Sequence, residues 1–333
     1  MSIENRKLEI GNLKIVFMGT PEFAVASLDA LVNTGYNIVA VVTAPDKLAG
    51  RGMKLTESPV KKYAARHHIK ILQPEKLKNP DFLDELKSLN ADLQIVVAFR
   101  MLPEVVWNMP PMGTINVHAS LLPQYRGAAP INWAIINGEK ETGITTFKLQ
   151  HEIDTGNILL QEKIESGENE TAGELHDRLK ELGAQVLLKT VEGLAEGTLK
   201  ETPQSVIGNS QLANEETQDS QLTTHDSRLR SAPKIFTKTC EIDWHKKADE
   251  IHNLIRGLSP YPAAFTELGD KTIRIFKSEI EMILPTTRVG HWESDKRSYL
   301  KFACSDGYVL FKDVQLEGKK RMIIEDFLRG YRF

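Results

Sequence analysis

Short apolar runs alternate with helical patterns through the first two hundred residues, and this alternation restricts the fold more than any other feature. The runs at 13–19, 37–43 and 92–99 are apolar almost throughout, without a polar residue at every second position. Strands of this kind are typical of parallel sheets, which are covered on both faces. Helical patterns at 22–33 and 81–90 separate them. The order strand, helix, strand predicts an α/β domain with a doubly wound parallel sheet.

The same alternation continues to about residue 200. Further strands are expected at 113–118, 143–149 and 157–164, with helices at 131–137 and 171–195. We therefore expect one α/β domain over residues 1–204.

A change of composition follows. Residues 201–235 are rich in Gln, Ser, Thr, Asn and Asp and nearly lack aromatic residues, which is typical of a linker; we expect its span to be 205–230. Short alternating runs at 263–268, 271–280 and 299–316 come next, the last with a Ser-Asp-Gly turn, and one helix is indicated at 246–256. This pattern predicts a small, open β-barrel of the oligonucleotide-binding type over residues 231–333.

Charge and composition limit the kinds of partner that this chain can have. The net charge is −3, yet residues 231–333 hold 18 Lys and Arg against 15 Asp and Glu. A slightly basic second domain fits contact with a polyanion, although a solvated surface explains it equally well. No apolar run approaches the roughly 18 residues of a membrane span, and the N-terminus lacks a secretory pattern. Cys240 and Cys304 are expected to be reduced, buried thiols of a cytoplasmic protein.

Two polar side chains stand out at the end of the strand predicted for 113–118. Asn116 and His118 are two residues apart, so they project from the same side of the strand. Open α/β sheets bind ligands at the carboxyl ends of their strands. An amide can donate to an oxyanion and an imidazole can exchange a proton, so the pair indicates half of an acyl-transfer site. The alternative is a capping Asn and a packed His.

A third candidate, Asp154, lies in the segment "HEIDTGNILLQ". Aspartate in such a turn often bonds only its own backbone. If the segment folds over the neighbouring strand end, Asp154 holds His118 in one tautomer and stabilises its charged form. No Ser or Cys nucleophile with an adjacent base stands out, so the attacking group is expected to belong to the substrate.

These segments, together with "SLLP" and "YRGAAPINWAI", resemble the folate-dependent formyltransferases. The resemblance implies a Rossmann-like domain joined to a C-terminal barrel, and formyl transfer from 10-formyltetrahydrofolate to an amine by Asn116, His118 and Asp154. It also implies that the turn formed by Ser120, Leu121, Leu122 and Pro123 contributes to the folate pocket.

The resemblance extends to further segments of the chain, and it implies one acceptor, the amino group of methionine on initiator tRNA. They include "TAPDKLAGRGMKLTESPVK" and "IRGLSPYPAAFT". The resemblance implies that the glycine-rich loop of the first segment reaches toward the acceptor end of the tRNA through Lys47, Arg51 and Lys54, which suits phosphate contacts. An exposed basic loop without this role is the alternative. An amino sugar nucleotide or a purine precursor remains as a rival acceptor, and an RNA-binding module as a rival class.

Two departures from the family pattern are visible. Arg100 stands where the family commonly has glycine, and its side chain either meets a folate carboxylate or points to solvent. The linker also looks longer than usual. No His, Cys, Asp and Glu cluster has metal-ligand spacing, so we expect no metal, and we expect a monomer.

Overall fold

The computed structural model describes residues 12–49, 54–205 and 229–331, which divide into two units. The first unit takes the described residues up to Arg126, Gly143–Lys163 and those from Asp177 to Arg230. The second takes Gly127–Thr142, Ile164–His176 and the described residues from Ser231 onward. Two segments from the first 204 residues therefore belong to the second unit.

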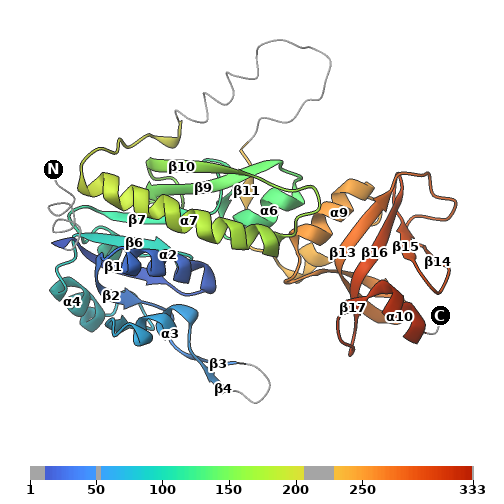
Figure 1. Cartoon of the computed structure of the whole chain (residues 1–333), viewed down its shortest axis with the longest axis horizontal. Coiled ribbons are helices and arrows are strands. Elements are labelled where there is room, and N and C mark those ends of the chain that lie inside the picture. Colours follow the sequence, from blue (N-terminus) through green and yellow to red (C-terminus); the bar gives the residue numbers. More distant parts are fainter. Residues whose placement is uncertain (1–11, 50–53, 206–228, 332–333) are drawn as a thin grey trace, which may run out of the picture. The chain divides into compact units, whose positions relative to one another are not determined.

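A seven-stranded sheet forms the centre of the first unit, in the order β10-β9-β7-β6-β1-β2-β5 (Figure 1). Its strands are β1 (Lys14–Gly19), β2 (Asn37–Val42), β5 (Ile71–Leu72), β6 (Leu93–Val97), β7 (Thr114–His118), β9 (Glu141–Lys148) and β10 (Ile158–Glu165). The pairs β1·β2, β1·β6, β6·β7 and β2·β5 are parallel, which confirms the predicted sheet. Strand β9 departs from it, because it pairs antiparallel with β7.

Helices cover both faces of this sheet, as a doubly wound fold requires. They are α2 (Glu22–Asn33), α3 (Pro59–Arg66), α4 (Pro80–Ser88), α5 (Glu104–Trp107) and α7 (Ala172–Ala195). On one face, Val16 and Met18 share a buried cluster with Phe82 and Leu86 of α4. On the other face, a side chain at Gly183 of α7 would come into ordinary contact with Val117 and Ile144. Figure 1 shows α7 running across the strands.

The glycine-rich segment expected as a loop is a hairpin in its described parts. Strand β3 (Lys47–Ala49) pairs antiparallel with β4 (Lys54–Thr56). Arg51 lies outside the described residues, as do 206–228, most of the predicted linker. The residues directly before the expected linker pack against the first unit, because Thr202 bridges to Ile158 and Gln204 is 4% exposed.

An antiparallel sheet forms the centre of the second unit, in the order β12-β13-β16-β15-β14, with β17 on β16. Its strands are β12 (Ala264–Leu268), β13 (Lys271–Glu281), β14 (Trp292–Ser294), β15 (Leu300–Ala303), β16 (Tyr308–Leu316) and β17 (Met322–Ile323). The predicted turn at Ser305 joins β15 and β16. This curled antiparallel sheet is consistent with the expected open barrel, although β14 and β17 were not predicted.

The remaining elements are short. They are β8 (Arg126–Gly127), α6 (Pro130–Ile136), β11 (Ser231–Ala232), the 3-10 helix η1 (Thr237–Cys240), α9 (Ala248–Gly257) and α10 (Ile324–Gly330). Helix α6 packs on α9: the Asn132 amide donates to the Gly257 carbonyl at 2.7 Å, and a side chain at Gly257 would collide with Ile136. The second unit is therefore built partly from a helix that precedes β9 in the chain.

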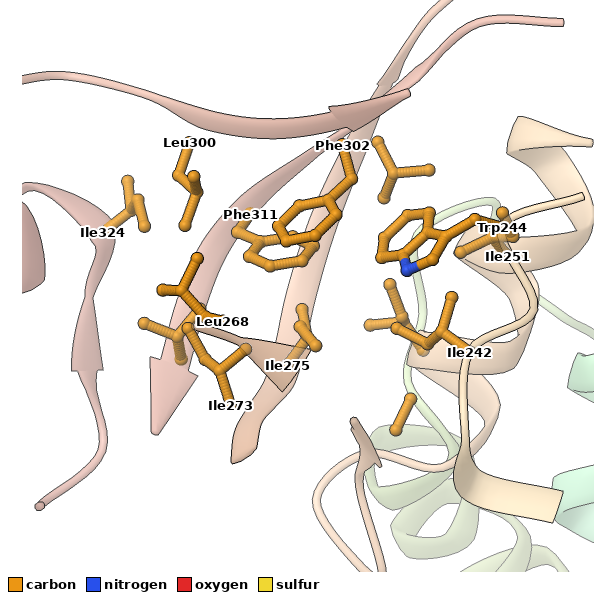
Figure 2. Close-up of a cluster of buried hydrophobic side chains, with 14 of the residues drawn as sticks. Ile242, Trp244, Ile251, Leu268, Ile273, Ile275, Leu300, Phe302, Phe311 and Ile324 are labelled. Carbon is orange, nitrogen blue, oxygen red and sulfur yellow. The ribbon is translucent and has the colours of Figure 1, made fainter. Parts of the chain in front are cut away.

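Stacked aromatic rings fill the core of the second unit (Figure 2). Trp244 stacks on Phe302 with ring centroids 4.6 Å apart, and Phe302 stacks on Phe311 at 5.0 Å. The Trp244 indole donates to the Thr266 hydroxyl at 3.0 Å, so its polar atom is satisfied. Cys240 and Cys304 are free and buried in this cluster, as expected. None of the described helices is both long and apolar enough to cross a membrane.

Helix α9 also carries a buried histidine that is expected to make the stability of the second unit depend on pH. His252 is 9% exposed and its Nδ1 lies 3.0 Å from the Ser278 hydroxyl. Burial and the charge of Arg256 lower the pKa of His252, against smaller opposing effects of Glu168 and Glu279. The unfolded chain thus takes up the proton more readily, so the stability is present above about pH 6.5 and is lost as the pH falls below it.

Replacing His252 with glutamine should reduce this acid destabilisation, because glutamine does not titrate. Thermal unfolding of the wild type and His252→Gln at pH 7.5 and pH 5 measures the effect. His245→Gln is the control, because the His245 side chain is 86% exposed. Equal losses of stability in the wild type and His252→Gln would contradict the prediction.

Candidate active site

The carboxyl end of β7 places two of the predicted residues together. Asn116 pairs with Val96 of β6 and Phe147 of β9, and His118 is the last residue of the strand. Their side chains project from the same side, as the spacing predicted. His118 is only 6% exposed, whereas Asn116 is half-buried. No hydrogen bond of the Asn116 amide to another described residue is found, so the amide is available to a ligand.

The His118 ring is held between two oxygen atoms. Its Nε2 lies 2.9 Å from the carbonyl oxygen of Tyr125. A carbonyl only accepts, so Nε2 carries a hydrogen and Nδ1 is the nitrogen that exchanges a proton. Nδ1 lies 4.0 Å from Oδ2 of Asp154. The ring edge also meets the face of Phe147, with centroids 6.5 Å apart.

The turn that carries Asp154 does fold over the end of β7. Asp154 adopts a left-handed backbone conformation with φ 54°, and its side chain is 13% exposed. Two residues later the chain passes so close to β9 that a Cβ on Gly156 would lie 1.6 Å from the Lys148 carbonyl oxygen. Only glycine fits there. The glycine at position 156 is therefore required by the turn that places Asp154 beside His118.

The Ser-Leu-Leu-Pro turn is fastened by its own hydrogen bonds. The Ser120 hydroxyl donates to the Gln124 carbonyl at 2.7 Å, and the Thr145 hydroxyl donates to the Ser120 carbonyl at 2.6 Å. Leu122 is fully buried and Pro123 is buried, whereas Leu121 is half-buried. Most of these side chains therefore build the turn itself, and Leu121 is the one with the most surface for a ligand.

The β3–β4 hairpin is anchored at its base. Lys47 is exposed at the start of β3, and Asp46 directly before it contacts Lys61 of α3 and accepts from the Gln73 amide at 2.8 Å. The hydrogen bonds from Lys61 and Gln73 lower the pKa of Asp46. This anchor holds the strand that carries Lys47, and the sequence analysis did not identify it.

Arg100 is an exposed residue whose side chain is anchored to the backbone. Its guanidinium donates to the backbone carbonyls of Glu75, at 2.8 Å, and Pro74, and it lies 5.6 Å from the centroid of the Phe99 ring. Burial lowers its pKa. The side chain therefore fastens the segment after β5 to the end of β6.

Comparison with known proteins agrees with this fold. Residues 13–191 match the formyl transferase family and residues 234–332 match the formyl transferase C-terminal domain. The chain therefore belongs to the formyl transferase family.

Within that family the similarity over nearly the whole chain is to methionyl-tRNA formyltransferases. The enzyme of that name from Azobacteroides pseudotrichonymphae is 53% identical over 327 residues, covering 95% of each chain. That from Bacteroides fragilis is 50% identical over 325 residues, covering 96% of this chain and 95% of its own. The N-formyltransferase from Helicobacter canadensis, in complex with folinic acid and dTDP-3-aminofucose, shares the fold with a TM-score of 0.63 at 21% identity, covering 90% and 98% of the chains.

Three residues beside the catalytic candidates were missed by sequence reasoning. The Tyr125 carbonyl binds His118, and Arg126 and Gln204 contact each other behind the Asp154 turn. Tyr125 and Arg126 lie in the "YRGAAP" motif, which was a usable signal. Gln204 lies at the end of the expected α/β domain, directly before the expected linker, where no signal marks it.

Proposed function

We propose that this chain transfers the formyl group of 10-formyltetrahydrofolate to the amino group of methionine on initiator tRNA. The observation that carries the proposal is the 53% identity with a methionyl-tRNA formyltransferase across 95% of both chains. The convergence of Asn116, His118 and Asp154 at one strand end supports the chemistry.

The proposed reaction is an attack of the methionyl amine on the formyl carbon. A carbon–nitrogen bond forms, the carbonyl oxygen becomes an oxyanion, and the amine gives up a proton. The bond from that carbon to N10 of the folate then breaks, and N10 takes a proton. The Asn116 amide suits the oxyanion, because it has no hydrogen-bond partner among the described residues.

His118 has two possible roles in this reaction, donation to the oxyanion or removal of the amine proton. Because Nε2 donates to Tyr125, the exchange of a proton falls to Nδ1, directly or through a water. The carboxylate of Asp154 lies on that side of the ring and stabilises the imidazolium that forms. This arrangement favours proton removal by His118.

Substrate binding is assigned to two further regions. The Ser120–Pro123 turn borders the same strand end, which supports a place in the folate pocket. Lys47 lies in β3 and Lys54 in β4, and Arg51 stands between these strands in the sequence. All three residues are assigned to tRNA phosphates. The described residues contain no group of three His, Cys, Asp or Glu arranged to hold a metal, and no step above needs one. A cytoplasmic monomer is our proposal for the working state.

A formyl-transfer assay tests the proposed function. Purified protein is given 10-formyltetrahydrofolate with either methionyl-initiator tRNA or an amino sugar nucleotide. Transfer to the tRNA alone, weakening steeply with salt, is the expected result. Transfer only to the amino sugar would overturn the assigned acceptor, and transfer to neither would overturn the assigned chemistry.

Removing the Asn116 amide is expected to lower kcat by about 10²- to 10³-fold, the usual effect of losing one oxyanion donor. The change is Asn116→Ala, and steady-state kinetics with methionyl-tRNA measure it. Asn33→Ala is the control, because the Asn33 amide binds only Asp29 on the surface of α2. A kcat within about twofold of the wild type would remove Asn116 from the proposed mechanism.

A further inference from the structure

Gln204 is a buried side chain that the proposed mechanism does not use. It follows the bridge between Thr202 and Ile158 and is 4% exposed. Its side chain binds the backbone of the turn that carries Asp154, and it also binds Arg126, the residue after Tyr125.

The orientation of the Gln204 amide follows from its partners. Its Nε2 donates to the backbone carbonyls of Asp154 and Gly156, both at 2.9 Å. Its Oε1 accepts from Arg126, whose Nε is 3.0 Å away and whose Nη2 also donates. Arginine only donates and carbonyls only accept, so no flipped amide satisfies these contacts. Gln204 therefore fixes the backbone on both sides of Thr155.

Arg126 connects the Gln204 amide to the turn at Tyr125, a residue that also contacts the His118 ring. It directly follows Tyr125, whose carbonyl oxygen holds His118 Nε2. Tyr125 and Asp154 both have left-handed backbones, with φ 60° and 54°, a conformation that non-glycine residues adopt only when their surroundings hold them. The contact between Arg126 and Gln204 thus joins the two strained turns that flank the His118 ring.

We infer that the Arg126–Gln204 bridge sets the distance between His118 and Asp154, and that both are positioning residues for the formyl transfer. The inference rests on the proposed function. Neither side chain touches a reacting atom; each acts through a turn. With the bridge intact, His118 Nδ1 lies 4.0 Å from Asp154 Oδ2. Without Gln204, the carbonyls of Asp154 and Gly156 lose the donor that anchors them, and the carboxylate moves relative to the ring. Without Arg126, the Gln204 amide is no longer held in the orientation that anchors them.

Two substitutions of Gln204 separate its contact with Arg126 from its contacts with the carbonyls of Asp154 and Gly156. Gln204→Glu keeps an acceptor for Arg126 but has no donor for the carbonyls of Asp154 and Gly156. Gln204→Leu removes both contacts. We expect both variants to lose about 10- to 100-fold in kcat, the usual effect of displacing a catalytic group by a fraction of an ångström to 1 Å, with KM for both substrates within about twofold. Near-normal kcat in Gln204→Glu would overturn the inference.

A double substitution gives the sharper test. If Gln204 acts only through Asp154, adding Gln204→Leu to Asp154→Asn costs less than about twofold further, measured in single-turnover reactions. If the two losses multiply, Gln204 acts elsewhere and the inference fails. Arg126→Lys is the second route to the same test should the Gln204 variants not fold, because lysine cannot supply the paired donors.

Gln94→Leu serves as the matched control. Gln94 is 1% exposed in β6 and accepts from Thr114 at 3.1 Å, so Gln94→Leu removes a buried glutamine from the same unit without touching the bridge. It is expected to lower the melting temperature and leave kcat unchanged. A loss of kcat there equal to that of Gln204→Leu would show that lost stability alone explains the effect. An inactive wild type would instead refute the proposed function.

Discussion

Replacing His118 with glutamine is expected to lower kcat for methionyl-tRNA formylation by about 10³-fold or more. The glutamine amide can still donate to the Tyr125 carbonyl, so the neighbouring turn keeps its contact. It cannot exchange a proton at the position of Nδ1, beside Asp154. The loss therefore measures the chemistry of the imidazole. Single-turnover kinetics with saturating substrates give the rate of the chemical step.

The same substitution at a second buried histidine provides the control. His252 lies in the second unit and belongs neither to the three proposed catalytic residues nor to the β3–β4 hairpin, so His252→Gln is expected to leave kcat unchanged at neutral pH. If His118→Gln retained activity within about tenfold of the wild type, His118 would be a packed histidine and the proton would pass through another group.

Replacing Asp154 with asparagine is expected to lower kcat by about 10²- to 10⁴-fold, the range found when the aspartate of a catalytic triad is neutralised. The backbone of the turn keeps its anchors, because Gln204 binds the carbonyls of Asp154 and Gly156. What is lost is the negative charge that stabilises the imidazolium. KM for both substrates should change little, and steady-state kinetics separate the two parameters.

The chain offers an exposed pair of the same composition as a control. Asp243 Oδ1 lies 3.3 Å from Nδ1 of His245, and both side chains are more than half exposed. Asp243→Asn should leave formylation unaffected. A small effect of Asp154→Asn, comparable to that of the control, would mean that Asp154 only closes its own turn, the alternative that its sequence context left open.

Most of the sheet of the first unit could be predicted from the sequence, because strands buried on both faces are continuous apolar runs. The apolar runs at β1, β2 and β6 could be assigned without further information. The direction of β9 could not be assigned: it is buried like the central strands, yet it runs antiparallel to β7. Burial does not determine direction, because the orientation of a strand depends on its connections, which leave no periodic pattern.

Only part of the candidate site could likewise be predicted from the sequence. Asn116 and His118 follow from the period of a strand, and Asp154 was placed near them by a turn and a resemblance. Every residue has a backbone carbonyl, so the sequence could not indicate that the carbonyl of Tyr125 contacts His118. Gln204 was hidden for a different reason: composition averages over a window, and one buried glutamine in a polar stretch does not change the average. Arg100 likewise binds backbone carbonyls, which residue types do not reveal.

The interleaving of the two units along the chain bears on how such a protein could have evolved. Helix α6 and residues 164–176 belong to the second unit although most of the α/β unit surrounds them in sequence. Arg256 of α9 donates to the carbonyls of Gly167 and Glu170, and Asn132 of α6 binds Gly257, so these insertions are part of its packing. A recombination event within residues 206–228 would carry across only part of that unit. A piece of the chain that begins after that point therefore lacks part of the packing of the second unit.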